Sequence, residues 1–194
     1  MSKIKLKHSS GNSMSIEAPA NNPASDLSLK LPATVGSAGQ VLKNGSTAGT
    51  LEFGSNWFFE VRRADNSNQT GYNGSGAAGL TNLVEFNATN YDVGSNWNTS
   101  TYLFTVPETG LYQFYGSTHT SSSSTLQAWL VVNGSRAQYT DWVQNTGDEF
   151  LNSAHTLYLT AADTVGYHLY TGTTTSVTIN YSVNHTWFKG YKVH

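Results

Sequence analysis

The sequence predicts an all-β protein, in which a sandwich of short strands follows an extended N-terminal arm. From Ser55 onward, short runs of strand-forming residues are separated by clusters of turn residues, a pattern typical of a sandwich or barrel. No stretch of useful length fits the helical period. Ser, Thr and Asn together occupy 65 of 194 positions while charged residues make up 11%, so neutral side chains carry the polarity. Such surfaces suit extracellular and viral β proteins.

The first 54 residues form a part of the chain with a different composition. They contain three of the four prolines and few large side chains, so we expect no independent core there. Apolar and lysine residues alternate at 3–7 and again around 27–31, which predicts two short strands. Residues 40–44 and 50–53 flank the sequence GSTAG and are expected to form a hairpin. We therefore divide the chain into an arm, 1–54, and a head, 55–194.

Ten strands are expected in the head. Their ranges are 57–63, 83–86, 101–106, 111–118, 125–132, 136–143, 154–160, 164–171, 176–183 and 186–193. Asn133 and Gly134 lie between two of them. This pair predicts a type I′ hairpin turn, because both of its central residues must adopt positive φ angles and Asn-Gly does so at low cost.

Aromatic residues occur on both sides of the strand that begins near Leu111. In an extended strand Tyr112 and Phe114 project to one face, and Tyr115 to the other. A strand that is apolar on both sides needs cover on both sides, which the opposing sheet and a neighbouring subunit would provide. The alternative is an ordinary core with a few exposed rings. The predicted interface residues are Phe58, Tyr112, Phe114, Tyr115, Trp187, Phe188 and Tyr191.

The head resembles the globular head of complement component C1q and the tumour necrosis factor-like jelly rolls. The residues that carry the resemblance occur in order along the chain: Phe86, Asn90, Trp97, Phe104, Thr105, Pro107, Gly110, Tyr112 and Phe114, then the Asn133-Gly134 turn, then Leu157, Leu159, Asp163 and Val165, and finally Phe188 and Gly190. The resemblance implies a ten-stranded jelly-roll sandwich that assembles as a homotrimer. It also implies that the first, third and last strands lie near the threefold axis.

The arm departs from that family, because no collagen-like Gly-x-y repeat precedes the head. Residues 29–54 instead resemble hairpin segments of phage tail-fibre and virion proteins. This resemblance implies a structural protein of a bacteriophage virion, made in the host bacterial cytoplasm. Its extended arm is expected to bind other virion proteins and to help the chain trimerise, and its head to adhere to the host surface as a tail fibre or fibre tip. Capsid decoration as a head fibre, and a secreted lectin-like or signalling jelly roll, are the alternatives. The predicted docking residues are Lys3, Ile4, Lys5, Leu6 and Lys7.

Four aromatic residues lie in or beside turns rich in Gly, Asn and Ser, where rings and amides could contact a glycan or protein of the host surface. They are Tyr72, Trp97, Tyr139 and Trp142. The alternative is that these rings close the ends of the sandwich or the seams between subunits.

No catalytic constellation is evident, so no enzyme activity is expected. Residues 74–79 spell a dinucleotide-binding fingerprint but neither follow a clear strand nor open a helix. The histidines are scattered and cysteine is absent, so we expect no metal site and no cofactor. The net charge is −2 without a basic face, and no apolar run approaches 18 residues, so neither nucleic-acid binding nor membrane insertion is expected.

Overall fold

A computed structural model describes most of the chain, and the chain divides into two compact units, Met1–Gly54 and Ser55–His194. The boundary coincides with the change in sequence composition. The described residues are 3–7, 9–11, 13–17, 28–37, 40–64, 66, 68–75, 82–122, 125–144, 147–172, 177–181 and 184–193. Within these ranges the side chains of 3–7, 13–17, 122 and 139–144 are not described.

The arm consists of two separate antiparallel pairs of strands. β1 (Lys3–Lys7) pairs with β2 (Ser13–Glu17), and β3 (Gln40–Asn44) pairs with β4 (Leu51–Ser55). The strand expected at 3–7 and the 40–53 hairpin are thus confirmed. β2 was not predicted, although the alternating sequence SMSIE is a period-two signal.

The head contains twelve strands within the described residues. They are β5 (Phe58–Arg62), β6 (Gln69–Tyr72), β7 (Ala88–Asp92), β8 (Trp97–Asn98), β9 (Leu103–Thr105), β10 (Gly110–Ser122), β11 (Thr125–Val132), β12 (Ser135–Gln144), β13 (Gly147–Leu159), β14 (Thr164–Thr171), β15 (Val177–Ile179) and β16 (Trp187–Lys192).

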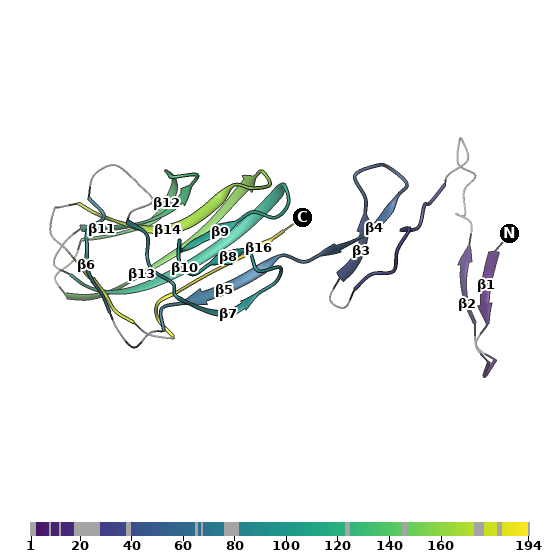
Figure 1. Ribbon diagram of the computed structural model, residues 1–194, viewed down its shortest axis with the longest axis horizontal. Helices are drawn as coiled ribbons and strands as arrows, with labels where there is room; N and C mark the ends of the chain where they lie inside the picture. The colour runs from purple at the N-terminus through teal and green to yellow at the C-terminus, as the bar shows by residue number, and fades with distance from the viewer. Residues whose placement is uncertain are drawn as a thin grey trace. The chain divides into compact units, whose positions relative to one another are not determined.

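These strands form two antiparallel sheets that pack as a sandwich (Figure 1). The larger sheet has the order β6–β15–β10–β16–β5–β7, with β13 paired along the other edge of β10. The smaller sheet has the order β12–β11–β14–β9–β8. The all-β sandwich is therefore confirmed, with additional short strands that the sequence did not predict.

The core lies between the sheets and is dominated by aromatic rings. Phe59 on β5 stacks on Phe104 of β9 with ring centroids 4.5 Å apart, and Phe188 on β16 contacts Tyr167 of β14 at 5.5 Å. The sheets approach closely at Gly116 on β10, because a Cβ there would overlap the Tyr167 ring. Alternation along β5, β10 and β16 of the larger sheet sends Phe59, Gly116 and Phe188 inward and their neighbours outward.

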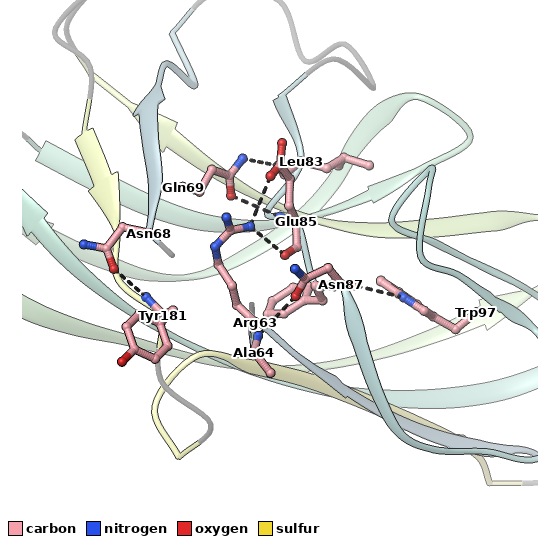
Figure 2. A network of polar contacts seen from close by, with 10 residues as sticks. Arg63, Ala64, Asn68, Gln69, Leu83, Glu85, Asn87, Trp97 and Tyr181 are labelled. Carbon is pink, nitrogen blue, oxygen red and sulfur yellow. Dashed lines mark hydrogen bonds and ion pairs between the residues drawn. The ribbon is translucent and has the colours of Figure 1, made fainter. Parts of the chain in front are cut away.

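The segment 83–86 was predicted as a strand, and that prediction is wrong. Hydrogen bonds from side chains hold this segment in place, instead of a complete ladder of backbone hydrogen bonds between strands (Figure 2). Arg63 donates to both the backbone carbonyl and the carboxylate of Glu85, at 3.0 and 3.1 Å. Gln69 donates to the Leu83 carbonyl and accepts from the Glu85 N–H, both at 3.1 Å. Leu83, Val84 and Phe86 of this segment are core residues. The Gln69 amide and the Arg63 guanidinium form several of the hydrogen bonds that its backbone requires.

The predicted Asn133-Gly134 turn is confirmed. Val132 and Ser135 are paired across it, and φ is 49° at Asn133 and 78° at Gly134. The Asn133 side chain also accepts from the Thr164 N–H at 2.9 Å and donates to Asp163 at 2.7 Å. The turn is thereby tied to the start of β14.

Candidate functional site

The outward face of the larger sheet carries several partly exposed aromatic rings, which we call the aromatic face. Residues directly opposite one another in paired strands share a face. The pairings of Phe58 with Tyr191 and of Tyr191 with Gln113 therefore place β5, β16 and β10 side chains together. The rings of the aromatic face belong to Phe58, Tyr91, Tyr115, Phe150, Tyr158, Trp187 and Tyr191.

A groove lies at the β5–β7 edge of this face. Phe58 and Tyr91 meet edge to face at 5.5 Å, and the Tyr191 hydroxyl donates to Gln113 at 2.9 Å. Each of the three rings is about two-fifths exposed, at 40%, 44% and 41% in chain order. The groove has a volume of about 460 Å³ and is lined by Asn56, Trp57, Phe58, Phe59, Tyr91, Lys189, Gly190, Tyr191 and Lys192.

Polar groups fix the orientation of these rings. The Tyr91 hydroxyl and the Asn90 amide both donate to the Glu60 carboxylate, at 3.0 and 2.6 Å. Partial burial, together with the Glu60 carboxylate, raises the pKa of Tyr91. A hydrogen bond with Tyr191 raises the pKa of Tyr115. Both phenols are therefore neutral at physiological pH, and the rings can contact an apolar partner without an added charge.

Two further exposed rings lie on β13, which pairs along the other edge of β10, and they are eight residues apart along the strand. Tyr158 is 73% exposed and Phe150 is 45% exposed. Phe150 stacks on His119 of β10 at 4.6 Å and meets His185 edge to face at 5.0 Å. The sequence prediction missed both rings, although alternation with the inward residues Leu151 and Leu159 was a signal that could have found them.

The structure corrects three of the seven predicted interface residues. Tyr112, Phe114 and Phe188 have no exposed surface in the single chain and belong to the core between the sheets. Burial raises the pKa of Tyr112 to about 12, and its hydroxyl donates to the Glu108 carbonyl at 2.7 Å. The other four, Phe58, Tyr115, Trp187 and Tyr191, lie on the aromatic face.

Two of the predicted host-contact residues are also core residues, and that prediction is wrong for them. Tyr72 is 4% exposed and Trp97 is 7% exposed. The Trp97 indole donates to the Phe86 carbonyl at 3.2 Å and stacks on Phe59, so neither ring face is available to a sugar (Figure 2). These rings close the sandwich, which was the alternative interpretation.

The remaining predicted contacts lie outside the described side chains. Tyr139 and Trp142 are in β12, where the backbone register pairs them with Trp129 and Gln127 of β11. Lys3, Ile4, Lys5, Leu6 and Lys7 make up β1, and their side chains are likewise not described.

A buried polar network joins β6, β12 and β14. His168 lies within 2.6 Å of the Asn82 carbonyl through Nδ1, which requires Nδ1 to donate and leaves Nε2 to accept from Arg136 at 3.1 Å. Burial lowers the pKa of His168 to about 4, and the Arg136 charge acts in the same direction. The Tyr72 hydroxyl accepts from the Leu169 N–H at 2.9 Å, and burial raises its pKa. This arrangement connects the β6 end of the head to the smaller sheet.

No cluster of three or more His, Asp or Glu side chains that could hold a metal ion occurs among the described residues. Nor does the described part of the chain contain a helix long and apolar enough to span a membrane. The dinucleotide-like sequence at 74–79 lies largely outside the described residues.

Comparison with known proteins identifies the head. Residues 67–193 match the C1q domain. The globular domain of zebrafish complement 1qA protein is similar with a TM-score of 0.51 and 18% identity, over 71% of this chain and 98% of that one. The Eiger TNF of S. frugiperda gives a TM-score of 0.55 at 12% identity, over 72% and 93%, and murine APRIL at pH 8.5 gives 0.51 at 12%, over 72% and 100%. No curated protein matches the chain.

Proposed function

The chain belongs to the C1q domain family, and from that premise we propose that it is a homotrimeric, non-enzymatic structural protein of a bacteriophage virion, a tail fibre or fibre tip. In this proposal the head assembles through the aromatic face and presents its loops to the host surface. The arm attaches the trimer to other virion proteins.

The observation that carries the proposal is the aromatic face itself. A single chain leaves five rings of this face more than a third exposed: Phe58, Tyr91, Phe150, Tyr158 and Tyr191. Contiguous exposed apolar surface of this kind is typical of protein interfaces. Fully burying an exposed ring contributes roughly 1.5–3 kcal/mol, and covering a ring that is already partly buried contributes less, so a neighbouring copy must cover several of these rings at once to offset the cost of association.

The placement of the rings favours a closed ring of copies over a twofold dimer. The groove lined by Phe58, Tyr91 and Tyr191 lies near one edge of the larger sheet, and Tyr158 and Phe150 lie on the edge strand β13. The groove and the exposed Tyr158 ring near the opposite edge suit a heterologous contact, in which Tyr158 of one copy meets the groove of the next. A trimer satisfies that pairing in every copy.

Sedimentation equilibrium of the full chain tests the assembly. We expect the mass of three chains at micromolar concentration. Tyr158→Glu places a charge in the contact and is expected to weaken association at least tenfold. Gln138→Glu, an exposed change of the same charge on β12, is the matched control and should leave the mass unchanged. A stable, folded species with the mass of one chain would refute the trimer.

The virion role is supported by the arm. It is a separate unit with its own strand pairs, it lacks the collagen repeat of complement proteins, and its sequence resembles hairpin segments of phage fibre proteins. Deleting residues 1–54 should leave the head folded but abolish its incorporation into phage particles. Immunogold micrographs of particles would distinguish a tail position from capsid decoration. Protein recovered only from the culture medium would instead favour the secreted alternative.

A further inference from the structure

The second half of the arm is an ordered β layer without an interior. The backbone of Lys30 donates to Gly49 at 2.7 Å and accepts from Leu51 at 2.8 Å, which adds the 28–31 segment in parallel to the β3–β4 hairpin. Yet every described residue in the ranges 28–37 and 40–53 is exposed or half-buried. A unit of this size rarely folds alone without a metal, a disulfide or oligomerisation, and the chain contains no cysteine.

Large apolar side chains of this layer project into solvent. Leu29 is 65% exposed, Leu31 is 75% exposed and Val35 is 93% exposed. Leu29 and Leu31 alternate with Lys30, so the two leucines share one face of the layer and the lysine is on the other. The Lys43 ammonium lies 3.7 Å from the Glu52 carboxylate of the paired strand. The leucine pair therefore forms an uncharged strip. Lys30 is on the opposite face, and Glu52 neutralises the charge of Lys43.

The connection to the head indicates which partner covers this strip. β4 ends at Ser55 and β5, a strand of the aromatic face, begins at Phe58, so two residues separate the layer from the proposed trimer contact. This step rests on the proposed homotrimer. In such an assembly three identical layers are tethered by short connections, at an effective concentration in the millimolar range. If the leucine strips are turned toward the threefold axis, symmetry brings the same leucines together in every copy.

We propose that residues 28–53 form a second trimer contact, in which Leu29 and Leu31 of the three copies pack against one another. The partner of this surface is thus the same chain rather than another virion protein. The head and the layer then assemble independently, and attachment to the particle is left to the preceding part of the arm.

The absence of cysteine allows a direct test on the full chain. Leu31→Cys introduces the sole thiol, and an interchain disulfide forms only where two Cα atoms come within about 7 Å. Mild oxidation of the native protein should join about two of every three chains, because one thiol in each trimer has no partner. Lys30→Cys, one residue away on the opposite face, is the matched control and should remain largely reduced.

The outcomes separate the two proposals. A trimer by sedimentation in which Leu31→Cys cross-links no more than Lys30→Cys would overturn the arm contact and leave the head trimer standing. A monomer would overturn both. A second variant, Leu29→Glu with Leu31→Glu, should remain trimeric through the head, while the layer is cleaved by protease at least tenfold faster than in the wild type. Equal cleavage rates would also overturn the arm contact.

Discussion

The head and the arm are both built from paired strands, but only the head encloses side chains. In the head, Phe59, Phe86, Tyr167 and Phe188 meet between two sheets and are almost completely buried. In the arm, the 28–31 segment and the β3–β4 hairpin have regular backbone hydrogen bonds and no buried side chain among their described residues. Backbone pairing alone thus gives local order, whereas stability of a single chain requires a second layer to exclude water.

The chain provides a convenient way to observe the two units separately. All five tryptophans lie between residues 57 and 187, so tryptophan fluorescence reports only on the head. A tryptophan introduced at Leu42, which is 52% exposed, would report on the arm. A substitution in one unit can therefore be compared with the unchanged other unit as its reference.

Removing a central ring of the head should have the largest effect. Phe188→Ala deletes a fully buried ring that contacts Phe59 at 5.3 Å, Phe114 at 5.8 Å and Tyr167 at 5.5 Å. We expect the free energy of unfolding of the head to fall by about 3–5 kcal/mol. Urea unfolding followed by tryptophan fluorescence measures the change.

The arm provides the control for that substitution. Leu42→Ala removes an exposed side chain of similar hydrophobicity and should change head unfolding by less than about 0.5 kcal/mol. If the two substitutions had equal effects on the head, the contrast between an enclosed core and an open layer would be wrong.

The sequence predicted where the strands lie better than which of their faces point inward. Period-two alternation was sufficient to locate β10, β11 and β14 along the chain. It could not decide which face of β10 or β16 points inward, since Phe114 and Tyr115 are equally aromatic. Packing against the opposing sheet decides which face points inward. That packing depends on contacts between residues far apart in the chain.

The sequence also did not reveal the short strands or the buried polar pairs. β8 has only two residues, and β6 contains Gly71 with φ of 71°, so neither gives a periodic signal. His168 and Arg136 are paired only after β12 and β14 are brought together by β11. Scattered histidines in the sequence gave no indication that this one is fully enclosed.

Two glycines allow the same added methyl group to be compared in the two units. At Gly190 in β16 a Cβ would lie 2.5 Å from the Phe114 ring and 2.9 Å from the Phe59 ring, both fixed in the core. At Gly36 in the arm a Cβ would lie 2.5 Å from the Phe53 ring, which is half-buried and free to turn away. Gly190→Ala should cost about 1–3 kcal/mol of head stability, and Gly36→Ala should leave the head unchanged.

The measurement is again urea unfolding by tryptophan fluorescence, with the introduced Leu42→Trp reporter for the arm. Gly147→Ala is the matched control in the head, since a Cβ at that position meets nothing within 4 Å. Equal losses for Gly147→Ala and Gly190→Ala would indicate that strand propensity, and not overpacking, determines the result.

Acidification should affect the head by a smaller amount. Burial lowers the pKa of both His155 and His168 from 6.5 to about 4 in the folded head. Because these pKa values are depressed on folding, the neutral imidazoles stabilise the head fully above pH 6.5. That contribution is lost as the pH falls toward 4, where the unfolded chain binds protons that the folded chain does not. Between pH 7 and 5 we expect a loss of at most about 2 kcal/mol for each histidine.

His168→Gln removes the contribution of one of the two histidines to this pH dependence. Glutamine retains an uncharged donor and acceptor for Asn82 and Arg136, so the variant should be less stable at pH 7 but lose less stability between pH 7 and 5. The sequence of residues 28–53 contains no histidine, so the final fraction of chains cross-linked through Leu31→Cys should be the same at both pH values once each reaction is complete, although the scarcer thiolate makes the reaction slower at pH 5. A wild-type head whose urea midpoint is the same at pH 7 and 5 would show that water reaches these imidazoles. The enclosed core that distinguishes the head from the arm would then be more open than its packing indicates.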